Sequence, residues 1–144
     1  MRRPERHSFG WRLADAVCVD PAFVHLVWPK VSHWIKAALE RGDMGTFSSV
    51  EVDVLNARAL LWVVWNEPDL EGAAVTQVEN TESSKVCTIV AFGGLRKSVH
   101  LLAKLEDYAR QQGCTVSRIV GRYGWQRILP DYRTAKVILE KRLT

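Results

Sequence analysis

The sequence has 144 residues, of which 47% are hydrophobic and 25% are charged, and these proportions are typical of a single globular domain. The net charge of +4 is too small an excess for a dedicated nucleic-acid-binding protein, so nucleic acid is not expected as a partner. No apolar run approaches the roughly 18 residues needed to cross a bilayer, so no membrane association is expected.

The chain start and the cysteines carry little functional information. Residues 1–10 are rich in charge and are predicted to form a loose arm before a single domain over residues 11–144. This charged start lacks the apolar region of a secretory signal, so a cytoplasmic protein is expected. Cys18, Cys87 and Cys114 are widely spaced, which predicts neither a disulfide framework nor a zinc site, and no metal is expected.

A long helix is predicted over residues 21–42. Asp20 is placed to cap the first free N–H groups, and Pro21 suits the first helical position. Apolar residues then recur with helical spacing to the end of the run. Pro29 lies inside this run, and because proline has no N–H to donate, it predicts a kink or a break.

Residues 46–58 carry two conflicting patterns. Ser48 and Glu51 have the spacing of a capping box, which indicates a helix. Three valines alternate with acidic residues in the same stretch, which indicates a strand. We favour a short helix here.

Three strands are predicted in the middle of the chain, over residues 59–65, 72–79 and 85–92. Residues 66–71 and 80–84 contain proline, aspartate, asparagine or serine and indicate the intervening turns. Such short connections permit only antiparallel pairing, so the three strands form a meander.

The remaining elements predict that the sheet is mixed. An amphipathic helix over residues 97–112 is followed by a strand at residues 115–120, which should lie parallel to residues 85–92 after a right-handed crossover. A short helix at residues 125–129 and a last strand at residues 135–143 complete the order. The fold class is therefore α/β, with a mixed sheet flanked by helices.

A glycine pair and two cations stand between the third strand and the amphipathic helix. Gly93 and Gly94 are followed by Arg96 and Lys97, at the predicted start of that helix. A helix N-terminus offers free N–H groups and about half a positive charge, so this arrangement would suit a phosphate. A plain turn with solvated charges remains the alternative.

These pieces occur in an order that resembles the GNAT superfamily of acyl-CoA N-acyltransferases. The matching stretches are AAVTQVE, VCTIVAFGG, LLAKLEDYARQQGC, SRIVGR, GWQRILPDY and VILEKRL, and the resemblance covers roughly residues 20–143. More narrowly, the sequence is similar to short GNAT-like proteins of tailed phages and prophages. The resemblance implies a GNAT-like central mixed β-sheet flanked by helices. It also implies acetyl-CoA or another acyl-CoA as cosubstrate and an amine as acceptor, in the host cytoplasm if the protein is phage-encoded.

The resemblance also implies where the cosubstrate would bind. In the family, the strand that matches residues 85–92 contacts the pantetheine arm, and the following loop and helix start hold the pyrophosphate. Carried over to this sequence, the pantetheine would lie against Ala91, Phe92 and Gly93. The pyrophosphate would be held by Gly94, Leu95, Arg96, Lys97 and Ser98.

Acid and base residues are implied in the same way. Family members often carry a tyrosine in the helix after the next strand, which protonates the departing thiolate. Residues 125–129 contain none, but Tyr123 and Tyr132 flank them and would substitute. The attacking ammonium must also lose a proton, and Glu79 beside the expected cleft is the predicted base, ahead of Glu71.

Two departures from the family pattern support a second hypothesis. The glycines precede Arg96 rather than follow it, and the helix at residues 125–129 lacks its tyrosine. A GNAT-fold protein of a phage or prophage that has no catalysis and acts by binding a protein, ahead of nucleic acid, accounts for both departures. Trp125 would line a pocket or form the partner surface, and packing in the core is the alternative. The arginines at 118, 122, 127 and 133 would also suit stacking on nucleic acid, which is the less favoured interpretation.

Overall fold

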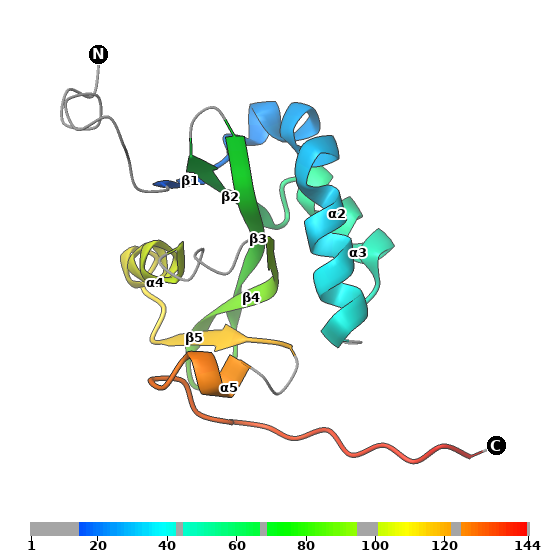
Figure 1. The fold of residues 1–144 in the computed structure, drawn as a ribbon. Helices are drawn as coiled ribbons and strands as arrows, with labels where there is room; N and C mark the ends of the chain where they lie inside the picture. The colour runs from blue at the N-terminus through cyan, green and yellow to red at the C-terminus, as the bar shows by residue number, and fades with distance from the viewer. Residues whose placement is uncertain (1–14, 43–44, 67–68, 95–100, 122–124, 144) are drawn as a thin grey trace.

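The computed structural model is a five-stranded sheet with helices on both faces (Figure 1). The structure describes residues 15–42, 45–66, 69–94, 101–121 and 125–143. The strands are β1 (Asp15–Cys18), β2 (Leu60–Asn66), β3 (Asp69–Asn80), β4 (Lys85–Gly94) and β5 (Val116–Ile119). Their order in the sheet is β1-β2-β3-β4-β5. The first four strands pair antiparallel and β5 pairs parallel to β4, so the predicted meander and the mixed sheet are confirmed.

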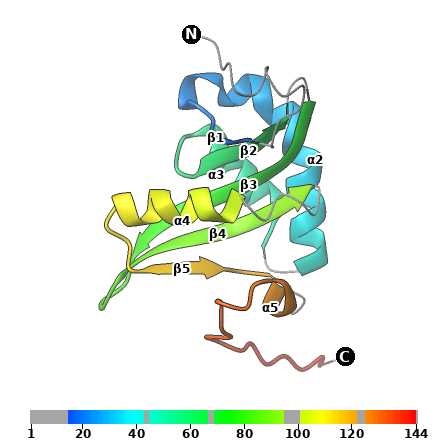
Figure 2. The same ribbon diagram turned by 60° about the vertical axis from the view of Figure 1, so that its left-hand side comes forward.

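The helices form two layers around this sheet. A 3₁₀ turn (Pro21–Phe23) leads into α2 (Val24–Gly42), and α3 (Phe47–Leu55) lies beside α2 on one face. The opposite face is covered by α4 (Leu101–Gln111), with the short α5 (Trp125–Ile128) near β5 (Figure 2). None of the helices among the described residues is long and apolar enough to cross a membrane.

The predicted start of the first helix is confirmed. The Asp20 carboxylate accepts a hydrogen bond from the Ala22 N–H at 2.9 Å, and Pro21 occupies the first turn. Pro29 lies inside α2 without breaking it. Because a proline at this position removes the hydrogen bond to the carbonyl of His25, tertiary packing rather than backbone hydrogen bonding keeps the helix continuous here.

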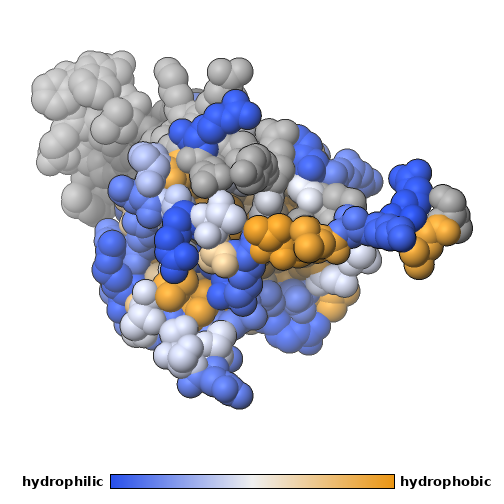
Figure 3. All heavy atoms as spheres, turned by 90° about the horizontal axis from the view of Figure 1, so that it is seen from below, coloured by the Kyte–Doolittle hydropathy of each residue, from blue (hydrophilic) through white to orange (hydrophobic). Residues whose placement is uncertain are grey.

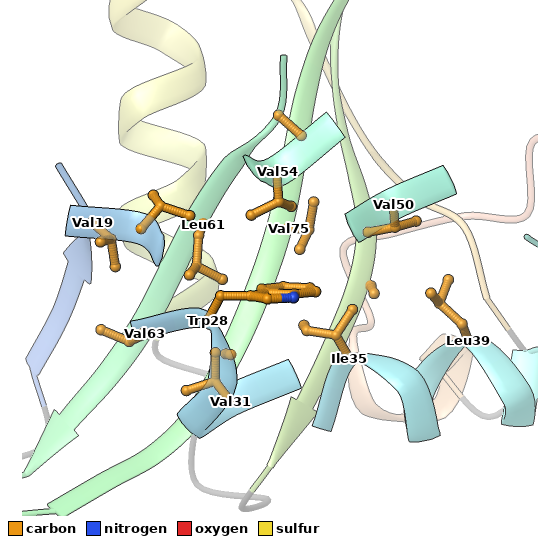
Figure 4. Packing of buried hydrophobic residues seen from close by; sticks show 14 residues of the cluster. Val19, Trp28, Val31, Ile35, Leu39, Val50, Val54, Leu61, Val63 and Val75 are labelled. Carbon is orange, nitrogen blue, oxygen red and sulfur yellow. The ribbon is translucent and has the colours of Figure 1, made fainter. Parts of the chain in front are cut away.

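Packing of α2 and α3 against the sheet forms the larger hydrophobic core (Figure 4). Trp28, Val31 and Ile35 point from α2 toward β2 and β3, and α3 adds two buried valines. On the other face, the apolar side of α4 packs against Ile89 and Trp62. The helical periodicity of both helices thus identified the faces that are buried.

The helix expected within residues 46–58 is confirmed, but its predicted capping box is wrong. Thr46 is the N-cap residue, and Glu51 does not return to the helix start. Instead, the Glu51 Oε2 accepts a hydrogen bond of 2.7 Å from the Trp28 indole N–H. The Trp28 ring also stacks on Phe47, so Trp28 joins α2 to α3 through both a hydrogen bond and a ring contact.

Glu51→Ala is expected to lower the free energy of unfolding by about 1–3 kcal/mol, because the indole N–H of buried Trp28 loses its acceptor. Glu51→Gln keeps an acceptor oxygen at the same reach and should lose less than half as much. Urea unfolding followed by tryptophan fluorescence checks both values. Equal losses in the two variants would show that the charge of Glu51, rather than its hydrogen bond, stabilises the helix pair.

The sequence predictions and the structure differ in two strands: one that is present but not predicted, and one that is predicted but not formed. The strand β1 was not predicted, although it pairs with β2 from Asp15↔Trp65 to Cys18↔Trp62. The last strand, expected over residues 135–143, is not formed: residues 133–143 have neither helix nor strand, and their side chains are all exposed. Figure 1 shows this segment leading away from the domain.

Candidate functional site

A gap opens where β4 and β5 separate. Their parallel pairing runs from Val86↔Val116 to Ile89↔Ile119, and the Val120 N–H donates a further hydrogen bond of 3.3 Å to the Ile89 carbonyl. β4 continues to Gly94, pairing only with β3 over these last residues (Figure 2). Among the described residues, the backbone edge of β4 that faces β5 therefore has no strand partner beyond Ile89.

A β-bulge lies at the point of separation. Val75 pairs with Ala91 and Thr76 pairs with Ile89, so Val90 is an extra residue in β4. A bulge leaves one residue out of the ladder and bends its strand. Here it coincides with the end of the pairing between β4 and β5, and it leaves Val90, which lines the gap, out of the pairing with β3.

A small cavity of about 40 Å³ occupies this gap. It has room for a few water molecules. Three elements and one loop line it: Ala38, Arg41 and Gly42 from α2, Val90, Ala91 and Phe92 from β4, Val120 and Gly121 after β5, and Trp125 from α5.

Aromatic packing accounts for the small volume of the cavity. The rings of Phe92 and Trp125 meet edge to face, with centroids 5.5 Å apart and an interplanar angle of 61°. Trp125 also lies over Gly121, where an added Cβ would approach the indole Nε1 to 2.9 Å. The indole of Trp125 thus fills the space into which β4 and β5 diverge.

The lining is almost entirely apolar. Arg41 is the one ionisable residue among the lining residues of the described chain, and no lining residue there carries a carboxylate or imidazole. The described lining residues therefore offer backbone groups, apolar contacts and one cation, and none of them is a general base.

The glycine pair belongs to the strand and not to a turn. β4 runs through Gly93 and Gly94, which pair with Ala73 and Gly72. A Cβ on Gly93 would lie 2.5 Å from the Trp34 carbonyl oxygen. Gly94 has φ +115°, and its Cβ would collide with the backbone of Gly72. Close packing of β4 against α2 and β3 thus requires both glycines, whatever ligand they also face.

The structure describes some of the residues that are predicted to bind the cofactor. Ala91 and Phe92 line the gap, and Gly93 and Gly94 follow them along β4. Leu95, Arg96, Lys97 and Ser98 lie outside the described residues, and α4 is described from Leu101.

Glu79 is not brought to this gap. It pairs with Val86, whereas the lining residue Ala91 pairs with Val75, four positions away. Four residues of strand span roughly 13 Å, so the carboxylate lies toward the other end of the sheet. Its Oε1 accepts a hydrogen bond of 2.9 Å from the Thr88 hydroxyl, so Glu79 forms a contact between β3 and β4.

Tyr132 lies away from the gap, between α4 and β5. Its hydroxyl donates to Glu106 Oε2 at 2.7 Å and lies 2.7 Å from the Ser117 hydroxyl. Burial raises the pKa of Tyr132, and the hydrogen bond to Glu106 and that carboxylate's charge raise it further, whereas Ser117 lowers it. This tyrosine ties the chain after α5 to α4 and β5. Tyr123 lies outside the described residues, between the two lining residues Gly121 and Trp125.

Sequence reasoning missed the contribution of α2 to the pocket. Ala38, Arg41 and Gly42 are far from β4 in sequence and carry no motif. Their place follows from the close contact of Gly93 with the backbone of Trp34, one and two turns earlier on the same helix. The glycine at the end of an apolar strand is the sequence signal of that contact.

No protein-family model matches the sequence, and a search of curated proteins finds no match. Among solved structures, a predicted acetyltransferase from Clostridium acetobutylicum with acetyl-CoA aligns with a TM-score of 0.63 and 11% identity, covering 91% of this chain and 97% of the other. An aminoglycoside N-acetyltransferase, AAC(6')-Iy in complex with CoA, gives 0.62 and 13%, covering 92% and 98%. A ribosomal-protein-alanine N-acetyltransferase from Brucella melitensis biovar Abortus 2308 gives 0.62 and 10%, covering 92% and 99%. The chain thus has the fold of the GNAT acetyltransferases.

Proposed function

We propose that this protein is an acyl-CoA-dependent N-acyltransferase that binds the pantetheine arm in the gap between β4 and β5. The observation that carries the proposal is the unpaired edge of β4 beyond the bulge at Val90. An extended chain with amide groups, such as pantetheine, can hydrogen-bond such an edge as an added strand would. Two of the aligned acetyltransferase structures contain acetyl-CoA or CoA, which supports this choice of ligand.

The phosphates of the cosubstrate would lie at the other end of the arm. We place them against Gly94, Leu95, Arg96, Lys97 and Ser98, before the start of α4. Free N–H groups at a helix start, together with two cations, favour a pyrophosphate at that position. The apolar lining of Ala91 and Phe92 would hold the thioester end away from water.

The transfer itself would be a direct attack. The neutral amine nitrogen bonds to the thioester carbonyl carbon, the oxygen takes the negative charge, and a backbone N–H near Phe92 or Gly93 stabilises it. Collapse of this intermediate breaks the carbon–sulfur bond, and Tyr123 gives its proton to the departing thiolate. The nitrogen loses its extra proton as the amide forms, and this proton returns Tyr123 to its neutral form. Because Glu79 lies away from the gap and none of the described lining residues carries a carboxylate, we assign removal of the ammonium proton to water.

The acceptor would approach from the α2 side, where Ala38 and Arg41 line the gap. If the protein is phage-encoded, as the resemblance to short phage proteins implies, its activity would be in the host cytoplasm. Acylation assays against panels of amines, peptides and aminoglycosides would identify the acceptor. An absence of transfer to every class of amine would count against the activity.

Calorimetry with acetyl-CoA tests the cosubstrate. We expect saturable binding in the intact protein and at least a tenfold weaker Kd for Val120→Glu, which places a carboxylate in the gap. Val116→Glu is the matched control: it makes the same change on the exposed first residue of β5, at the other end of the ladder, and should bind normally. No binding at millimolar acetyl-CoA would rule the proposal out.

A second function is favoured by the packing of Trp125 on Phe92, which leaves only about 40 Å³ between the strands. A GNAT-fold protein with a filled gap would bind a protein partner, through the surface around Trp125, and would not transfer acyl groups. Trp125→Ala distinguishes the two functions. If the gap is filled in the working protein, only the alanine variant should bind acetyl-CoA. If Trp125 moves aside for the ligand, the intact protein should bind it as well.

A further inference from the structure

Residues 133–143 carry hydrophobic side chains that nothing in the described chain covers. The exposed fractions are 72% for Val137, 62% for Ile138, 90% for Leu139 and 86% for Leu143. Figure 3 shows hydrophobic side chains on the segment that projects from the domain. A single exposed leucine is ordinary on a protein surface, but four large apolar side chains within seven residues form a binding surface.

The order of these residues is that of a strand with one apolar face. In an extended chain, alternate residues share a face. One face would carry Val137, Leu139, Lys141 and Leu143, and the other Lys136, Ile138, Glu140 and Arg142. Three of four residues are apolar on the first face and three of four are charged on the second. This pattern is typical of an edge strand that has one face on a core and the other in water.

The sheet has an unfilled position for such a strand. β5 is the last strand in the order, and within the described residues no strand pairs with its outer side. Val116 on β5 is 41% exposed, and the rest of the strand is half-buried. An unprotected edge of this kind offers a row of backbone N–H and C=O groups to another chain.

The path of residues 133–143 leads away from the β5 edge of the same molecule. Tyr132 is fixed beside the start of β5 by its hydrogen bonds to Glu106 and Ser117. Beyond this anchor the segment leaves the domain in both ribbon views (Figures 1 and 2). A strand that projects from an anchored point, together with a free edge beside that point, gives each copy one donor and one acceptor.

We propose that this protein forms a two-fold dimer in which residues 135–143 of each copy pair with the β5 edge of the other. Such an exchange is isologous, because the same two surfaces meet twice and both are occupied within the dimer. It covers the apolar face of the segment and gives the backbone groups on the outer side of β5 a partner. The proposal is independent of acyl-CoA binding.

Sedimentation equilibrium of the full chain and two matched variants tests the exchange. Leu139→Ser removes an apolar side chain from the face assigned to the core, and we expect the dimer dissociation constant to rise at least about tenfold. Ile138→Ser makes a similar change one residue earlier, on the face assigned to water, and should raise it less than about threefold. Equal effects of the two variants would show that the segment does not dock as a strand.

Hydrogen exchange locates the contact. Amides of β5 and of residues 136–142 should become protected as the protein concentration passes through the dissociation constant, and this gain should be lost in Leu139→Ser. A chain that stays monomeric overturns the proposal, and so does protection that is independent of concentration, since it would mean that the segment pairs with its own β5. A dimer without new protection in β5 also overturns it.

Discussion

Gly93→Ala is expected to lower the free energy of unfolding by about 3 kcal/mol or more, enough to unfold a large share of the protein at moderate temperature. The added methyl carbon would lie 2.5 Å from the carbonyl oxygen of Trp34 and 3.1 Å from its Cβ. The first contact is with helix backbone, which cannot rotate away as the end of a side chain can. Relief therefore requires α2 to move off β4.

Gly45→Ala provides the matched control for this substitution. Its Cβ would meet only the end of the Leu39 side chain, at 3.7 Å, so stability should change by no more than about 0.5 kcal/mol. Urea unfolding monitored by circular dichroism measures both variants. If Gly93→Ala unfolds at the same urea concentration as the parent protein, α2 and β4 do not approach as closely as the structure has them.

The same contact changes how the glycine pair is interpreted. In the sequence, Gly93 and Gly94 precede Arg96 and Lys97 and therefore suggest a phosphate loop. In the structure they complete β4, where packing against Trp34 and Gly72 requires them. The pair is therefore weak evidence for a phosphate. The separation of β4 from β5, which depends on the pairing of residues distant in sequence, is the stronger argument for a ligand.

Local patterns in the sequence predicted most of the fold. Helical spacing identified α2 and α4, and short polar turns identified the antiparallel strands β2, β3 and β4. The strand β1 was missed because it has only four residues, and its strand character comes from pairing with β2. Nothing within so short a run shows periodicity.

Alternation alone led to the opposite error at residues 135–143. The pattern there is that of a strand, but a strand exists only where another strand pairs with it. Within the described residues of this chain no partner lies beside the segment. A sequence pattern thus reports what a segment can form, and the pairing partner decides whether it forms.

The site was harder to predict than the fold, because its residues are brought together by register. The strand position of Glu79 predicts a base near the cleft, yet β3 pairs this residue with Val86, before the bulge in β4. Arg41 reaches the gap from α2, about 50 positions before Ala91. Only the pairing of β3 with β4, and the helix packed across them, determine which of these side chains can meet a ligand.

Tyr123→Phe is expected to reduce the rate of acyl transfer about 100-fold or more, because the departing thiolate would lose its proton donor. The substitution removes one oxygen and no apolar surface, so acetyl-CoA binding should be nearly unchanged. Steady-state kinetics with acetyl-CoA and an accepted amine would separate a fall in kcat from a change in KM. A variant that keeps the parent kcat would remove Tyr123 from the mechanism.

Tyr132→Phe is the control for this substitution, since it makes the same change at the hydroxyl that lies between Glu106 and Ser117. We expect the parent kcat and a loss of stability of about 1 kcal/mol, from the lost hydrogen bonds.

The pH dependence of the free energy of unfolding shows whether the Tyr132 hydroxyl is the group that is lost. Because the pKa of Tyr132 is raised on folding, the stabilisation is complete below the unfolded value near 10 and falls as pH rises above it. The phenylalanine variant should lack this alkaline decrease, and a kcat lost in Tyr132→Phe instead of Tyr123→Phe would reverse the assignment of the proton donor.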